Sequence, residues 1–168
     1  MSKGERMRYF SSKWHGGELT SEEEDEIPLK YQEHLDRIVG QLPGDLRKLS
    51  KLGNLHDAII RHVQSNRSKA ELSIHLTSGY QQVGYRAMVL TYMGVPRESF
   101  DELRDLPSDR VWEVLYDEVD LEGEAAVHRM LFWPYAELVV VCSDFKLVTA
   151  SADGRGPRVP PFLELTEG

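Results

Sequence analysis

The sequence has almost no cysteine. Cys142 is its single cysteine among 168 residues. A lone cysteine excludes an internal disulfide and any Cys-x-x-Cys pair for zinc binding or redox chemistry. Cys142 ends the apolar run at 138–142, where a thiol normally packs as an inert side chain. We therefore predict no disulfide framework, no metal site and no bound cofactor.

Long apolar runs and secretion signals are also missing. The longest run, LVVVC at 138–142, has the length of a strand, whereas a membrane span needs about 20 apolar residues. The first residues, MSKGERMRYFSSKW, contain no apolar segment typical of a secretory signal. We predict a cytoplasmic protein that does not act at a membrane.

Positive charge is scarce. Twenty Lys and Arg residues against 28 Asp and Glu residues give a net charge of -8. This balance repels phosphate backbones, so we predict no nucleic-acid partner. The same field favours encounters with a basic protein. An acidic balance is also common in bacterial cytoplasmic proteins, so charge alone does not require a binding role.

Catalytic signatures are absent. The chain has no His-Glu-x-x-His, Gly-x-Ser-x-Gly, P-loop or Gly-x-Gly-x-x-Gly pattern. The two glycines of DGRGP at 153–157 follow the last predicted strand and open no helix, which indicates a turn. The sequence thus favours a protein that is not an enzyme, without excluding one.

The length and composition suit one globular domain. Hydrophobic residues make up 40% and charged residues 29% of the chain. A chain of this size can bury a core without a metal or disulfide. We divide residues 1–168 into an N-terminal arm with an acidic loop (1–26), a helical hairpin (27–53), an antiparallel sheet (54–152) and a tail (153–168).

Helical periodicity is clearest at 27–42, where apolar residues recur at spacings of three and four. Pro28 suits the first turn, and the acidic residues before it suit the positive end of the helix dipole. A second helix is predicted at 45–52, capped by Asp45. The MRYF segment at 7–10 is expected to dock as a strand or hook.

From residue 55 the apolar period changes to two, which predicts strands. One helix, at 97–105, interrupts them. The predicted strands are 55–64, 70–77, 82–93, 111–121, 124–133, 137–142 and 145–151. Short connections favour antiparallel neighbours. We predict an α+β fold in which the N-terminal helices pack on one face of a six- or seven-stranded, mainly antiparallel sheet.

The segment NLHDAIIRHVQ at 54–64 raises the question of a histidine site. In an extended strand, His56 and Asp57 point to opposite faces. His56 and His62 share a face but lie about 20 Å apart, too far to bind one metal ion. Alternatively, 54–57 is a turn in which Asn54 or Asp57 bonds local backbone amides.

A site could still be assembled from neighbouring strands. Side chains two residues apart in a strand share one face of the sheet, which places His75 on the same face as Glu71 and Ser73. In the same way, His128 shares a face with Glu124 and Met130.

Alternation also places Glu118 with Trp112, Val114 and Tyr116. His56, Arg86 or Tyr85 could be the partner of a buried Glu118. We favour structural pairing over catalysis for this carboxylate, because ion-pair networks also perturb pKa values. If the protein is an enzyme, the candidate residues are His56, Asp57, Glu118 and His128, with His75 as an alternative to His128.

Short motifs along the chain resemble uncharacterised bacterial domain-of-unknown-function families that begin near Met-Tyr-Phe and carry Leu-His-Asp-Ala where a strand starts. The matching residues are Tyr9, Phe10, Trp14, Leu55, His56, Asp57, Ala58, Tyr116 and Glu118, within residues 7–150. The acidic insert at 18–26 departs from that pattern. The resemblance implies a cytoplasmic bacterial protein similar to the immunity or accessory proteins found beside toxin genes. It singles out His56, Asp57 and Glu118.

Three hypotheses follow. The leading one is a non-catalytic binding or accessory protein, immunity-like in type, that uses an acidic surface against a basic protein partner. The second is a small hydrolase or metal-dependent enzyme with a site built from His56, Glu118 and either His75 or His128. The third is a homodimer formed through an edge strand or the open face of the sheet.

Overall fold

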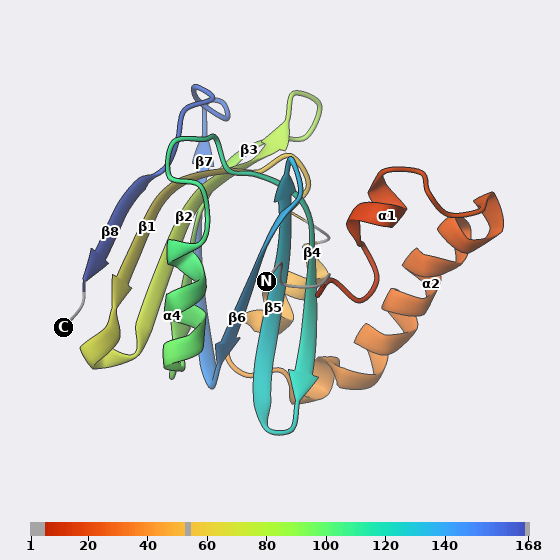
Figure 1. The fold of residues 1–168 in the computed structure, drawn as a ribbon, viewed down its shortest axis with the longest axis horizontal. Helices are drawn as coiled ribbons and strands as arrows, with labels where there is room; N and C mark the ends of the chain where they lie inside the picture. Colours follow the sequence, from red (N-terminus) through yellow and green to blue (C-terminus); the bar gives the residue numbers. More distant parts are fainter. Residues whose placement is uncertain (1–5, 53–54, 167–168) are drawn as a thin grey trace.

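The computed structural model describes residues 6–52 and 55–166, in which four α-helices and eight strands are the main elements, beside two short 3-10 helices (Figure 1). The helices are α1 (Ser12–His15), α2 (Ser21–Ile38), α3 (Leu46–Lys51) and α4 (Arg97–Arg104). The strands are β1 (Ile59–Asn66), β2 (Glu71–Tyr80), β3 (Gly84–Met93), β4 (Glu113–Glu122), β5 (Ala125–Trp133), β6 (Ala136–Cys142), β7 (Asp144–Ala152) and β8 (Phe162–Thr166).

The strands form one sheet in the order β6-β5-β4-β1-β2-β3-β7, and β8 pairs with β1. Every pairing is antiparallel except that of β1 with β8. The predicted α+β class is confirmed, because N-terminal helices pack against a mainly antiparallel sheet (Figure 1). The sequence predicted at most seven strands and a plain tail at 153–168, whereas this tail supplies β8.

Helix α2 begins six residues before the predicted helix at 27. Thr20 and Glu23 form a capping box, in which each side chain accepts the backbone N–H of the other residue. The predicted acidic loop is therefore wrong beyond Thr20: Glu22 to Glu26 lie in the first turns of α2, where negative charge stabilises the positive end of the helix dipole.

Strand β4 contains a β-bulge between Val114 and Tyr116. Val114 lies in the main core, whereas Leu115 packs in a second cluster on the other face of the sheet. The extra residue reverses the alternation downstream, as bulges do. Asp117 consequently shares the core face with Val114, and Glu118 does not.

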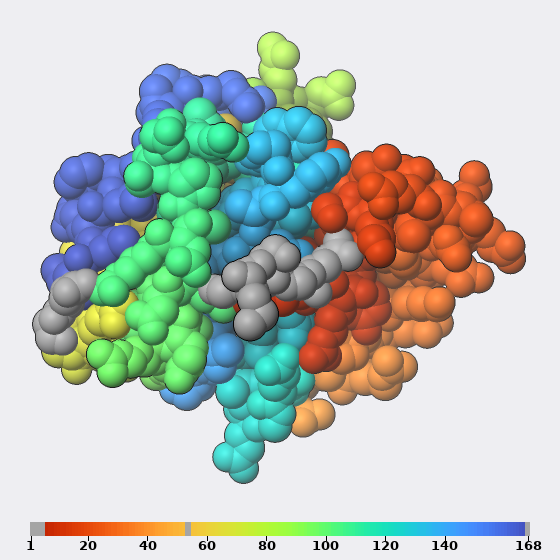
Figure 2. Space-filling view, in the orientation of Figure 1, coloured from red at the N-terminus to blue at the C-terminus, as the bar shows by residue number. Residues whose placement is uncertain are grey.

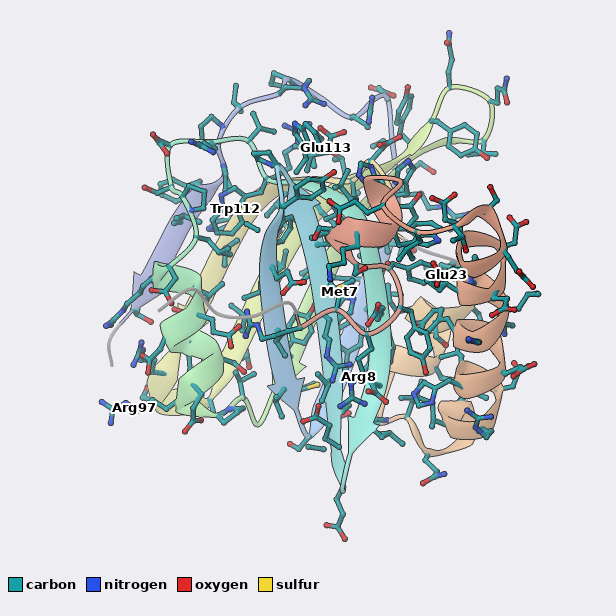
Figure 3. The ribbon with its side chains drawn as sticks, turned by 45° about the vertical axis from the view of Figure 1, so that its right-hand side comes forward. Met7, Arg8, Glu23, Arg97, Trp112 and Glu113 are labelled. Atoms are coloured by element: carbon teal, nitrogen blue, oxygen red, sulfur yellow. The ribbon has the colours of Figure 1, made fainter. Side chains whose placement is uncertain are left out.

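Two apolar clusters hold the fold together. The main core lies between the sheet and helices α2, α3 and α4. The smaller cluster lies where the N-terminal arm, residues 6–10, crosses β4 and β5, and it contains Met7, Phe10, Leu115 and Leu131. Figure 3 shows Met7 and Arg8 of the arm in front of these strands. The arm is thus the predicted hook and not a strand.

Cys142 is buried in the main core, and this burial raises the pKa of its thiol to about 12. None of the described helices combines the length and apolar character that crossing a membrane requires.

Candidate functional site

Strand β4 carries three buried carboxylates, Asp117, Glu118 and Asp120. Burying a carboxylate is costly unless hydrogen bonds or cations meet it. Each of the three therefore indicates a specific arrangement of partners, and together with the predicted histidines they are the first places to look for chemistry.

Asp117 belongs to a buried chain of polar groups inside the main core. Its Oδ2 accepts from Nε2 of His128 at 2.8 Å, and its Oδ1 accepts from the backbone N–H of Leu55 at 2.8 Å. The Tyr92 hydroxyl lies 2.6 Å from Nδ1 of His128. His128 is completely buried, as is Tyr92. This chain fixes the connection between α3 and β1 to the sheet, and no solvent reaches its imidazole.

Glu118 is occupied by the backbone of the N-terminal arm. Its Oε1 accepts from the N–H groups of Tyr9 and Phe10 at 2.6 and 2.7 Å, and its Oε2 accepts from that of Arg8 at 3.0 Å. Burial raises the pKa of Glu118, although these three hydrogen bonds oppose the shift. The partner expected from His56, Arg86 or Tyr85 is therefore wrong. Glu118 shares its face with Tyr116 but not with Trp112 or Val114, because of the bulge.

Glu137 accepts hydrogen bonds from the backbone of the two arm residues before Arg8. Its two carboxylate oxygens accept the backbone N–H groups of Arg6 and Met7 at 2.8 and 3.2 Å. Five consecutive arm amides thus bond two carboxylates, with no strand ladder in this segment. Two glutamates therefore replace the β-pairing that an extended arm would otherwise need.

Replacing Glu118 with alanine should release the arm at residues 8–10. Three arm amides, of which that of Phe10 is buried, would lose a charged acceptor, and a loss of about 1.4 kcal/mol already corresponds to about tenfold faster exchange through the opened state. We expect amide hydrogen exchange of Arg8, Tyr9 and Phe10 to accelerate by at least about tenfold. Glu137→Ala is the matched control, because it should accelerate exchange at Arg6 and Met7 instead. Unchanged protection at residues 8–10 in Glu118→Ala would contradict the assignment.

Asp120 connects three separate segments. It accepts from Arg8 of the arm at 2.7 Å, from His34 of α2 at 2.7 Å and from Arg129 of β5 at 3.0 Å. Burial acts to raise the pKa of Asp120, but the hydrogen bonds from Arg129 and His34 outweigh it and hold this pKa below its ordinary value. The sequence patterns gave no signal for this residue, because its partners come from distant parts of the chain.

His75 lies on the outer face of the sheet with His62 of β1, and their ring centroids are 5.0 Å apart. His62 Nε2 is 3.0 Å from Glu164 of β8. Desolvation and the neighbouring His62 lower the pKa of His75. His75 is thus on the opposite face of the sheet from His128, whose side chain lies in the main core.

The His56–Asp57 segment is a turn, as one of the two predicted alternatives had it, and β1 begins only at Ile59. Asn54, one of the two residues proposed to bond this turn, lies outside the described residues. Asp57 has a φ of 64°, a backbone conformation that Asp and Asn tolerate better than most residues. Its N–H donates to the carbonyl of Val114 at 2.8 Å, and Arg155 donates to its carbonyl at 3.0 Å.

The His56 ring is held in one orientation. Its Nδ1 donates to the carbonyl of Leu115 at 2.7 Å, because a carbonyl can only accept. The ring stacks on Tyr116 with centroids 5.0 Å apart, and Nε2 lies 3.4 Å from Oδ1 of Asp57. The Nδ1 hydrogen bond and the stacking together fix the orientation of the ring.

A cavity of about 420 Å³, which we call the turn cavity, opens beside His56 and Asp57. Its other wall is the β2–β3 hairpin, including Ser78, Tyr80 and Arg86. Of the predicted candidates, the structure brings His56 and Asp57 together here. Glu118 lies under the arm, His128 lies in the core and His75 lies on the outer face. Within residues 6–52 and 55–166, no three His, Cys, Asp or Glu side chains are grouped to hold a metal ion.

Helix α2 presents a second feature, which we call the acidic face of α2. At 100° per residue, its members fall within an arc of roughly 100°. They are Glu22, Asp25, Glu26, Glu33 and Asp36, all exposed, around a central Leu29 that is 66% exposed. Among the described residues, only Glu26 of these acids forms an ion pair, with Lys30. The helix forms one rim of the molecule, in orange in Figure 2.

No protein-family model, curated protein or solved structure matches this chain. The resemblance proposed from the short motifs therefore stays a prediction, and function has to be argued from the described residues themselves.

Proposed function

We propose that this protein is a non-catalytic binding or accessory protein that presents the acidic face of α2 to a basic protein partner. The observation that carries the proposal is the exposed Leu29 at the centre of five exposed acidic side chains. Interfaces commonly combine a central apolar anchor with a charged rim. The immunity-like role that the resemblance implies is one form of this function.

Helix stability does not account for the whole acidic face. Glu22 stands in the first turn, where it stabilises the helix dipole. Glu33 and Asp36 stand in the second half, where negative charge is unfavourable to the dipole. Like charges three or four residues apart also destabilise a helix slightly. A basic partner would relieve both costs and increase the association rate.

The other carboxylates support a structural interpretation. Glu118, Asp117 and Asp120 are occupied by the arm, by His128 and by arginines, so β4 offers no pair of carboxylates for acid–base catalysis. The hydrolase alternative required His56 and Glu118 in one cleft with a further histidine. Of the candidate residues, His56 and Asp57 line the turn cavity.

The binding proposal predicts a salt-sensitive interaction. We would use the wild-type protein and a Glu33→Lys/Asp36→Lys variant as matched baits in extracts of the source organism, and titrate any purified partner that only the wild type retains. Its affinity should fall as salt rises, because the attraction is screened. Leu29→Ala should weaken binding by about tenfold or more, as loss of an interface anchor does.

Two variants are matched controls. Val148→Ala removes an exposed apolar residue of β7, and Glu98→Gln removes an exposed charge of α4. Both should bind the partner like the wild type. If no partner distinguishes the two baits, or if the controls weaken binding as much as Leu29→Ala, the proposed function is wrong. Light scattering at two concentrations would show whether the partner is a second copy of the chain.

A further inference from the structure

Five strands of the sheet present an exposed side to solvent. Strands β8, β1, β2, β3 and β7 are neighbours in that order, and Figure 1 shows the first three side by side. The main core, with apolar side chains of α2, α3 and α4, lies on one side of them. We call the opposite side the outer face. The segment 153–157 borders it at Thr77, whose hydroxyl donates to the carbonyl of Arg155 at 2.6 Å.

The strand register places five side chains in one row across the outer face. Phe162 lies opposite His62, His62 opposite His75, His75 opposite Val89, and Val89 opposite Val148. A neighbour of each along its own strand packs into the main core, so the row itself points outward. The ring of His62 lies 5.0 Å from that of His75 and 5.3 Å from that of Phe162. The two ends of the row are the most exposed, with Phe162 at 63% and Val148 at 50%.

The next row carries opposite charges at its two ends. It runs across the same five strands through Glu164, Gln64, Ser73, Thr91 and Lys146. Four strand spacings separate Glu164 from Lys146, a distance of about 19 Å. These two charges are therefore too far apart to pair within one copy of the chain.

A two-fold axis along β2, the middle strand of the five, makes the outer face complementary to itself. Rotation of a second copy about this axis exchanges the β8 end with the β7 end and preserves the rows. Glu164 of each copy then faces Lys146 of the other, and Phe162 faces Val148, at both ends of the interface. His75 meets its own counterpart at the axis. Desolvation and the neighbouring His62 lower the pKa of His75, so these two rings meet uncharged at neutral pH.

The area of the outer face suits a weak dimer. Five strands at about 4.8 Å and about six residues at about 3.3 Å cover about 500 Å² on each copy. Two copies would then bury about 1,000 Å², the lower limit for a specific interface. We therefore expect an association that depends on protein concentration, and not a permanent dimer.

We propose that the outer face is the interface of a weak homodimer, in which a second copy of the chain packs face to face about a two-fold axis along β2. The exposed Phe162 and Val148 supply apolar contacts, and the reciprocal Glu164–Lys146 pairs set the orientation. This interface is separate from the acidic face of α2 and goes beyond the proposed function.

The first test is sedimentation equilibrium of the full chain at low salt, from about 5 µM to about 1 mM. We expect a monomer–dimer equilibrium with a Kd of about 100 µM or below. Lys146→Glu and Glu164→Lys should each weaken it by about tenfold, because each variant places like charges opposite one another at both ends. The double variant Lys146→Glu/Glu164→Lys should restore dimerisation. Lys13→Glu makes the same charge change on the exposed side chain of α1 and should dimerise like the wild type.

The second test is chemical cross-linking of cysteine variants. Phe162→Cys and Val148→Cys are treated separately and as a mixture with a bis-maleimide that spans about 10 Å, the spacing of packed sheets. Only the mixture should cross-link efficiently, because each variant alone holds its two cysteines at opposite ends of the interface, about 20 Å apart. The native Cys142 does not compete, since it is buried in the main core.

A chain that stays monomeric at about 1 mM would overturn the proposal. So would a dimer that neither charge reversal weakens, or cross-linking of either cysteine variant alone that matches the mixture. Glu164 also accepts from His62 at 3.0 Å, so circular dichroism must first show that the Glu164 variants fold. If they do not fold, Lys146→Glu and the cross-linking decide the outcome. The Glu33→Lys/Asp36→Lys variant should dimerise like the wild type, so failure of the partner experiment and failure of this one are distinguishable.

Discussion

An Asp117→Ala variant should lose about 2–6 kcal/mol of unfolding free energy, because two buried hydrogen-bond donors lose their acceptor at a cost of about 1–3 kcal/mol each. The substitution removes the acceptor of two donors, the completely buried His128 and the backbone N–H of Leu55. Both groups would then be desolvated without compensation. Urea denaturation followed by tryptophan fluorescence measures the change.

Two variants calibrate this effect. Tyr92→Phe removes only the hydroxyl next to Nδ1 of His128 and should cost about 1–2 kcal/mol. Asp153→Ala changes an exposed carboxylate and should stay within about 0.5 kcal/mol of the wild type. A double-mutant cycle between positions 117 and 128 should show strong coupling, because removing either partner already breaks the pair. An Asp117→Ala cost below about 1 kcal/mol would contradict this network.

An Asp120→Ala variant should lose about 3 kcal/mol or more, because Arg129 is only 4% exposed and would lose one of its two carboxylates. The same substitution takes an acceptor from His34 and from Arg8. We therefore expect α2 and the arm to loosen together, with faster hydrogen exchange in both segments. Lys48→Ala, which removes an exposed partner of Asp45, is a surface ion-pair control with little expected effect.

The acid limb of the stability curve tests the same residue. The pKa of Asp120 is lower in the folded protein than in the unfolded chain. Its stabilisation is thus complete above its ordinary pKa and is lost as pH falls through the lower, folded value. Wild-type stability should decline below about pH 4, and Asp120→Asn should flatten that decline.

Glu118 acts in the opposite sense, because burial raises its pKa. The difference between the wild type and Asp120→Asn, measured at each pH, therefore isolates Asp120 from the other carboxylates. If the two curves run parallel below about pH 4, the carboxylate of Asp120 does not titrate as its hydrogen bonds imply.

Local patterns predicted the secondary structure well where the spacing of apolar residues was regular over a whole helix or strand. The alternation of β2 and β3 and the amphipathic stripe of α2 each depend on neighbours in sequence, so they can be recognised without tertiary information. The start of α2 was missed because a run of like charges was interpreted as a solvated loop, although Thr20 and Glu23 fit a capping box.

The candidate site was less predictable. His56 and Asp57 were identified from the sequence, but the cavity beside them needs Arg86 and Ser78 from the β2–β3 hairpin. Glu118 was expected to pair with a side chain, but its partners are backbone amides, which leave no trace in residue types. Asp120 was missed altogether, since Arg8, His34 and Arg129 meet only in the folded chain.

By itself, the sequence determined the α+β class, the net negative charge and the lack of an internal disulfide, because periodicity and composition can be read without tertiary information. Only the tertiary structure decided which carboxylates are buried and what meets them. One bulge in β4 and the docking of the arm assign Asp117 to the core and Glu118 to the arm. Burial and pairing are set by contacts between residues about a hundred positions apart, such as Arg8 with Asp120, and no local pattern records them.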